Sequence, residues 1–266
     1  MRGRKDCQLE PQLWNSRRVS LDLLNGRDKQ AICYPQCTLE DVEQRIRELR
    51  ELKIELVEFT GKNHINNLAV LGKGCVGIVV VAYINGRQVA LKIRRTDASR
   101  STMHHEASIL EKANTVDVGP TLLGETQNCL LMEYVEGFLL PEWLEMHYQR
   151  NNRKRVQHVL RSIMEQARRL DQVGLDHGEL SNGSKHIIVK PDDVPVILDF
   201  ESGSISRRVS NVTSVSQFLF VGSSVAKLVE KILDSIDRDH LMEALKIYKR
   251  SKTSINFVEI LRSCRL

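Results

Sequence analysis

Three glycines are spaced as in a loop that binds a polyphosphate. Leu71–Val79 reads L-G-K-G-C-V-G-I-V, which contains the pattern G-x-G-x-x-G-x-V. Glycine lets the backbone pass close to phosphate oxygens and leaves its N–H groups free to donate hydrogen bonds to them. A glycine-rich turn without a ligand has the same composition, so this motif needs support from other residues.

A lysine and a glutamate further along the chain could complete such a phosphate site. Lys92 lies within the apolar run Val89–Ile93, where burial of an unpaired ammonium group would be costly. Nucleotide phosphates would be one partner for it. Glu106 would be another, because apolar residues follow three and four positions later and place the carboxylate on the inner face of a helix. The alternative is that Lys92 points outward from an edge strand and that Glu106 is a solvated helix charge.

Hydrophobic patterns predict the elements that would position these residues. The apolar runs Val76–Ile84 and Val89–Ile93 flank Asn85 and Gly86, a dipeptide that favours a tight turn, so we expect a β-hairpin. The glycine motif then lies inside a hairpin. A dinucleotide-binding fold would instead require these glycines to open a helix.

Helices are expected on both sides of this hairpin. Thr38 and Asp41 resemble an N-terminal capping pair, and apolar residues follow them at three- and four-residue steps. Residues 156–170 and 225–236 each trace an apolar helix face, whereas residues 194–200 indicate a short buried strand. The order is therefore β-rich first and α-rich last.

Five motifs in this order resemble those of a protein kinase. They are the glycine motif, the Lys92 and Glu106 pair, a hinge-like L-M-E-Y-V-E-G from Leu131, D-H-G-E-L-S from Asp176 and I-L-D-F-E from Ile197. The chain is similar to the predicted serine/threonine kinases of archaea, near the RIO-type and tRNA-modification-complex kinases, which keep a reduced C-lobe.

The resemblance implies an α+β, bilobal protein-kinase-like fold with a β-rich N-lobe and a reduced α-helical C-lobe. Residues 1–60 would form an N-terminal extension with one amphipathic helix, residues 61–137 the kinase N-lobe and residues 138–266 the C-lobe.

The resemblance also implies a role for each motif. Asp199 would bind the Mg²⁺ that bridges the β- and γ-phosphates of ATP, and Lys92, held by Glu106, would fix the α- and β-phosphates. Glu179 would stand where kinases have the aspartate that orients the attacking hydroxyl, so the catalytic set is Glu179, Lys92 and Asp199. The expected ATP-binding residues, with Met132 as gatekeeper, are Leu71, Gly72, Lys73, Gly74, Cys75, Val76, Gly77, Val79, Lys92, Glu106, Met132, Glu133 and Val135.

Three departures from the kinase pattern leave the activity open. Glu179 reaches one methylene further than an aspartate. Ser184 stands where a metal-binding asparagine is expected. We favour Asn182 as the oxygen ligand, because His186 is a softer donor that is poorly suited to Mg²⁺. The alternative is that Asn182 is a surface loop residue. Glu201 replaces the glycine of D-F-G, and no A-P-E motif follows.

These departures leave three interpretations of the function. The leading one is transfer of the ATP γ-phosphate to a Ser or Thr hydroxyl of a protein. A small-molecule kinase, acting on a sugar or an aminoglycoside-like acceptor, would use the same nucleotide site. A pseudokinase would bind ATP through Lys92 and the glycine loop without turnover and act as an interaction module.

Composition limits the partners and the compartment. The net charge of +5 permits an acidic partner without demanding one, and the basic cluster at residues 150–155 could meet RNA or an acidic protein, or could be a solvated approach to a helix. The longest apolar run, residues 77–84, is too short to span a membrane, and the N-terminus lacks a secretory signal, so we expect a cytoplasmic protein with reduced cysteines. Residues 1 to about 30 show little periodicity and predict a mobile extension or a loosely packed arm.

Overall fold

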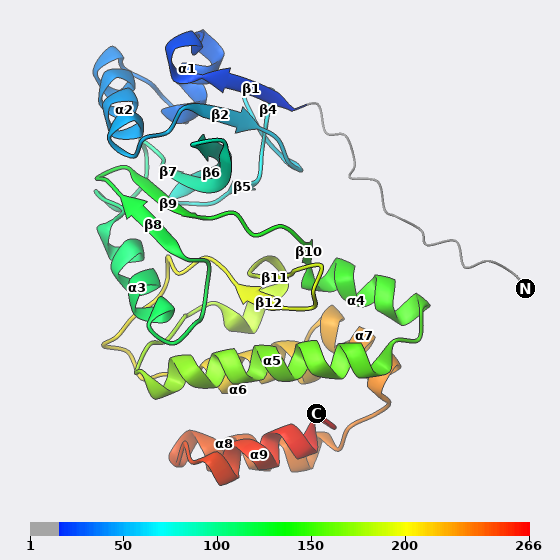
Figure 1. Cartoon of the computed structure of the whole chain (residues 1–266). Helices are drawn as coiled ribbons and strands as arrows, with labels where there is room; N and C mark the ends of the chain where they lie inside the picture. The colour runs from blue at the N-terminus through cyan, green and yellow to red at the C-terminus, as the bar shows by residue number, and fades with distance from the viewer. Residues whose placement is uncertain (1–15) are drawn as a thin grey trace, which may run out of the picture. The chain divides into compact units, whose positions relative to one another are not determined.

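The computed structural model describes residues 16–266, and its described part has a sheet-rich N-terminal portion and a helical C-terminal portion (Figure 1). This α+β architecture confirms the fold class predicted from the sequence. The chain divides into two compact units. The sheet unit contains the described residues up to Thr102 together with Thr126–Leu131, and the helical unit contains Met103–Glu125 and Met132–Leu266. The expected lobe boundaries at residues 61, 137 and 138 stay a prediction.

The sheet unit is built around an antiparallel hairpin. Its strands are β1 (Arg17–Ser20), β2 (Leu56–Phe59), β5 (Gly72–Lys73), β6 (Gly77–Ile84), β7 (Arg87–Arg94) and the start of β9 (Cys129–Glu133), with the short pair β3 (Asn63–Ile65) and β4 (Leu68–Val70). The order is β1-β2-β6-β7-β9, and β5 pairs with β6. Asn85 (φ 49°) and Gly86 (φ 71°) form the turn between β6 and β7, as predicted, because both residues tolerate the left-handed region.

The segment before residue 60 is an integral part of this unit. After the 3-10 turn η1 (Leu21–Leu23) come α1 (Gly26–Ile32) and α2 (Leu39–Glu51), and Thr38 and Asp41 form the predicted capping box of α2. The expectation of a loosely packed arm is wrong for the described residues 17–32, because β1 pairs with β2 and Val19 and Ile32 are buried in the core. The remainder of that prediction, residues 1–15, lies outside the described residues.

The helical unit contains a short three-stranded sheet. Its elements are α3 (His104–Asn114), β8 (Leu122–Glu125), β10 (Phe138–Leu139), α4 (Leu140–Gln149), α5 (Arg153–Gln172), the 3-10 segment η2 (Leu180–Lys185), β11 (Ile187–Val189), β12 (Pro195–Ile197), α6 (Asn211–Ser216), the π-helical η3 (Gln217–Val221), α7 (Ser224–Leu233), α8 (Arg238–Arg250) and α9 (Ser254–Ser263). The sheet order is β10-β11-β12, antiparallel throughout.

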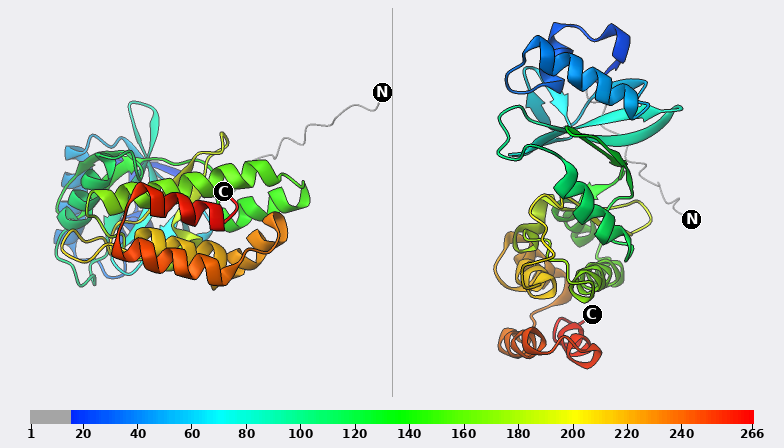
Figure 2. Two further views of the ribbon diagram at one scale, coloured as in Figure 1. Left: turned by 90° about the horizontal axis from the view of Figure 1, so that it is seen from below. Right: turned by 90° about the vertical axis from the view of Figure 1, so that its left-hand side faces the viewer.

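Helix α5 is the main buried helix of this unit. The apolar face predicted between Val156 and Leu170 is fully buried along its length. The predicted helix at residues 225–236 is α7, which ends at Leu233 because Asp234 takes a positive φ of 66°. Helices α8 and α9 pack side by side and are the last two elements of the chain (Figure 2).

Among residues 16–266 no single helix is long and apolar enough to cross a bilayer. The pair Asn211–Val221 and Ser224–Leu233, which is bent by 70°, is together long and apolar enough for a membrane span by length and composition alone.

Candidate functional site

The glycine motif lies within a hairpin of the sheet unit, as the sequence predicted. β5 pairs with β6 through Gly72 opposite Val79 and Lys73 opposite Ile78, and the N–H of Gly74 donates to the carbonyl oxygen of Gly77 at 2.8 Å. The tip of the loop, residues 73–75, is exposed. The backbone at this tip is therefore accessible to a ligand, whereas the flanking strands are fixed.

Lys92 is buried directly beneath this loop. It lies on β7 opposite Val79, with only 4% of its surface exposed. A β-carbon added at Gly77 would lie 3.1 Å from Lys92 Cγ and 3.2 Å from its Cε, so the glycine leaves room for the lysine stem. Strand β7 has neighbours on both sides in the sheet. The alternative of an outward-pointing lysine on an edge strand is therefore excluded.

An aromatic residue ahead of α2 holds the loop in place. Lys73 Nζ lies 4.8 Å and Arg95 Cζ 5.1 Å from the ring centroid of Tyr34, which is within the range of cation–π attraction. Arg95 also donates to the carbonyl oxygen of Gly74 at 3.1 Å and is paired with Asp97. Sequence reasoning missed this anchor, because Tyr34 is far from the glycine motif along the chain and only the fold brings the two together.

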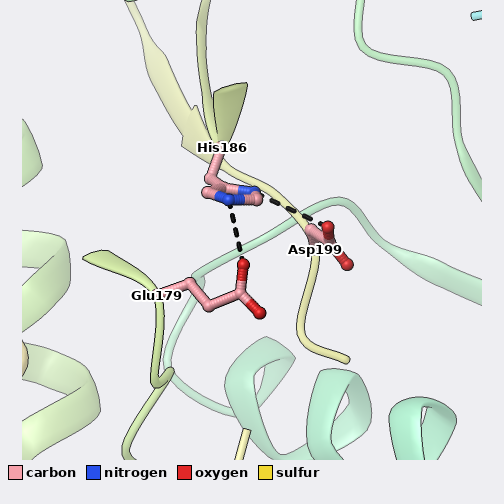
Figure 3. Close-up of side chains that lie close together, drawn as sticks. All are labelled: Glu179, His186 and Asp199. Atoms are coloured by element: carbon pink, nitrogen blue, oxygen red, sulfur yellow. Dashed lines mark ion pairs between the residues drawn. The ribbon is translucent and has the colours of Figure 1, made fainter. Parts of the chain in front are cut away.

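A histidine and two carboxylates meet in the helical unit. Glu179 precedes η2, His186 follows it, and Asp199 follows β12. His186 Nε2 lies 3.1 Å from Glu179 Oε2, and His186 Nδ1 lies 3.6 Å from Asp199 Oδ2. Figure 3 shows the imidazole between the two carboxylates, with one ring nitrogen facing each. One ligand atom from each residue lies within 4.8 Å of the others, so the group could hold a metal ion.

The backbone around this group is fixed by the fold. The N–H of Leu198 donates to the carbonyl oxygen of His186 at 2.7 Å, which extends the pairing of β11 with β12 up to the site. Asp199 has a φ of 67°, a left-handed conformation that is uncommon for residues other than glycine. Such conformations concentrate at functional sites, where the surrounding structure maintains them.

His177 supports the same loop from inside the unit. Its Nε2 lies 3.0 Å from the carbonyl oxygen of Leu198, and its Nδ1 accepts from the N–H of Glu179 at 3.4 Å. Burial lowers the pKa of His177 to about 4, so the ring is neutral near pH 7. A neutral ring with its proton on Nε2 satisfies both contacts, and it joins the segments that carry Glu179 and Asp199.

A second group of carboxylates shares Asp199. Oxygen atoms of Glu106, Asp199 and Glu201 lie within 4.8 Å of one another, and Glu106 is buried. From the sequence we treated Glu201 only as the replacement of a glycine, so its place beside Asp199 was missed. Oxygen ligands suit hard divalent cations, so this group of three carboxylates fits the Mg²⁺ that a kinase would use.

Asn182, the predicted metal ligand, lies on η2 with an exposed side chain. Its Oδ1 accepts a hydrogen bond from Ser184 Oγ at 3.5 Å. The metal-binding role of Asn182 stays a prediction. His186, which we set aside from the sequence as too soft a donor, is the residue that lies between the two carboxylates.

The predicted hinge lies where the chain passes from one unit to the other. Leu131 ends the sheet unit and Met132 begins the next part of the helical unit, both within β9. The N–H of Glu133 donates to the carbonyl oxygen of Thr121 at 2.9 Å, and Thr121 in turn donates to the Glu133 carboxylate. Val135 is buried. The adenine contacts expected of Met132, Glu133 and Val135 stay a prediction.

The basic cluster at residues 150–155 is partly engaged within the helical unit. Arg153 donates to Asp234, and Arg155 donates through two nitrogens to Asp193. Whether this cluster meets RNA or an acidic protein stays a prediction.

The predicted site residues therefore form two groups, one in each unit. The sheet unit holds the glycine loop and Lys92, and the helical unit holds Glu106, Glu179 and Asp199. Together with the α+β fold, these groups are those expected of a kinase-like phosphotransferase.

Comparison with known families agrees with that class. A family profile described as the RIO domain matches residues 80–209, a range that contains Lys92, Glu106, Glu179 and Asp199. The matched range is similar to an RIO-type atypical kinase domain, and proteins of that kinase-like family generally use ATP and a divalent metal. No curated protein matches the chain.

Proposed function

We propose that this chain is an atypical protein kinase that transfers the γ-phosphate of ATP to a Ser or Thr hydroxyl of a protein, with Mg²⁺ or another divalent ion. The observation that carries the proposal is the cluster of Glu179, His186 and Asp199, which lies within the residues that match the RIO domain. Fixed backbone holds both carboxylates, because Asp199 follows β12 and the N–H of Glu179 donates to His177. A kinase positions its metal ligand and its base in a comparable way.

The sheet unit supplies the groups that would bind the phosphates. The exposed tip of the glycine loop offers backbone groups, and the buried ammonium of Lys92 beneath it offers a positive charge. Phosphoryl transfer depends mainly on positioning and on neutralising charge, so these two features would account for nucleotide binding.

Glu179 would accept the proton of the acceptor hydroxyl. Its Oε1 already accepts a hydrogen bond from Ser202 Oγ, and its Oε2 faces His186. The carboxylate is therefore held in one orientation and can receive a hydroxyl donor. In the transfer step the acceptor oxygen bonds to the γ-phosphorus, the bond to the β,γ-bridging oxygen breaks, ADP leaves, and Glu179 takes the hydroxyl proton.

The test is incorporation of label from γ-labelled ATP by the purified full chain, with a divalent ion and a Ser/Thr-rich protein acceptor. Asp199→Asn, Glu179→Gln and Lys92→Met should each lower the rate about 100-fold or more, because each removes a group that acts in the transfer step. Glu243→Gln, on the exposed side of α8, is the matched control and should leave the rate unchanged.

Each other outcome points to a different function. Equal labelling by all variants would refute the assigned residues, and phosphoamino-acid analysis checks for Ser and Thr. Labelling of a sugar or an aminoglycoside without protein labelling would identify a small-molecule kinase. ATP binding without transfer would identify a pseudokinase.

A further inference from the structure

The imidazole of His186 faces two carboxylates at once. Its side chain is 11% exposed, and its two ring nitrogens lie 3.1 Å from Glu179 Oε2 and 3.6 Å from Asp199 Oδ2. A neutral imidazole carries one N–H, so it can donate to only one of these oxygens. The other nitrogen then directs its lone pair towards a carboxylate oxygen. A cation bound between these two atoms would stabilise this arrangement.

The separations suit a metal ion. A ligand distance of about 2.1 Å places neighbouring ligands of an octahedral ion about 3 Å apart. The 3.6 Å between His186 Nδ1 and Asp199 Oδ2 is close to this spacing, whereas the 3.1 Å between His186 Nε2 and Glu179 Oε2 matches a hydrogen bond from the ring N–H. One ring nitrogen can therefore bind the ion while the other donates to a carboxylate, which fixes the tautomer.

The choice of ligand atom decides which ion the site prefers. An asparagine would offer a hard oxygen, which suits Mg²⁺, whereas imidazole nitrogen suits first-row transition metals. We propose that Nδ1 of His186 is a nitrogen ligand of the ion held by Asp199, while its Nε2–H donates to Glu179, and that this nitrogen ligand makes the site bind Mn²⁺ more tightly than Mg²⁺. The inference rests on the proposed function in one respect: the ion bound here would be the divalent ion that the kinase uses with ATP.

The test is direct ion binding by the full chain without nucleotide. Calorimetric titration with Mn²⁺ and with Mg²⁺ gives the two affinities, and pulsed electron paramagnetic resonance of bound Mn²⁺ detects coupling to a ¹⁴N ligand. The unaltered chain should bind Mn²⁺ about tenfold more tightly than Mg²⁺ and should show nitrogen coupling. ¹⁵N-histidine labelling should change that coupling.

Two variants assign the nitrogen to His186. His186→Asn should abolish the coupling and lower Mn²⁺ affinity about tenfold or more, with a smaller loss for Mg²⁺. His240→Asn is the matched control, because His240 also lies 3.0 Å from a carboxylate, Glu259, but on an exposed helix pair. It should retain both the coupling and the affinity.

Several results would overturn the inference. They are Mn²⁺ binding by the unaltered chain without nitrogen coupling, no Mn²⁺ binding at all, or an unchanged affinity ratio in His186→Asn. The spectrum of the unaltered chain needs no variant, so misfolding of His186→Asn does not block the test. Phosphate transfer without nitrogen coupling would refute this inference alone, whereas nitrogen coupling without transfer would refute the proposed function alone.

Discussion

Gly77→Ala tests the close contact between the glycine loop and Lys92. The added β-carbon would lie 3.0 Å from the carbonyl oxygen of Ile93 and 3.1 Å from Lys92 Cγ, both closer than ordinary packing. Overpacking of this kind costs about 1–3 kcal/mol. The lysine stem is the softer neighbour and should move, so we expect the KM for ATP to rise about tenfold, the equivalent of about 1.4 kcal/mol.

Gly72→Ala is the matched control within the same loop. Its β-carbon would meet only Val79 side-chain atoms at 3.4 and 3.5 Å, which is ordinary contact. The free energy of unfolding should change by less than about 0.5 kcal/mol, and the KM for ATP should stay near that of the unaltered chain. Urea denaturation and steady-state kinetics measure both quantities. Equal effects of the two substitutions would refute the argument that Gly77 makes room for Lys92.

Two further substitutions test the sheet unit. Tyr34→Leu removes the ring that Lys73 and Arg95 contact, so the KM for ATP should rise about threefold. Tyr34→Phe keeps the ring and should leave the KM unchanged. Steady-state kinetics measure the KM of both variants. Glu48→Gln should lower the free energy of unfolding by about 2–3 kcal/mol in urea denaturation, because the buried carboxylate accepts several hydrogen bonds that an amide N–H₂ cannot accept. Exposed Glu51→Gln should change it by less than about 0.5 kcal/mol.

Elements encoded by local patterns could be predicted from the sequence. The turn at Asn85 and Gly86, the cap at Thr38 and the buried face of α5 each depend on residues within a few positions of one another. Turn geometry, capping and helical periodicity are local effects, so they remain visible without the fold.

Features that depend on distant contacts could not be predicted. Strand β1 has only four residues and is defined by its pairing with β2, and Tyr34 acquires a role only through Lys73 and Arg95. Glu201 likewise becomes a candidate metal ligand only because it lies beside Asp199 in the fold. Sequence spacing does not encode such proximity, which the packing within each unit creates.

The candidate metal site shows a proximity that counting residues along the sequence does not reveal. Counting five residues from Glu179 gives Ser184, which does not match the kinase pattern. The structure contains a 3-10 segment there, and Asn182 departs from helical geometry with φ −124° and ψ 47°. This kink takes up additional residues before β11, so the side chain that reaches the two carboxylates comes from His186. Position in space, and not the count along the chain, therefore decides which side chain lies beside the two carboxylates, and in the proposed site its ligand atom is a nitrogen.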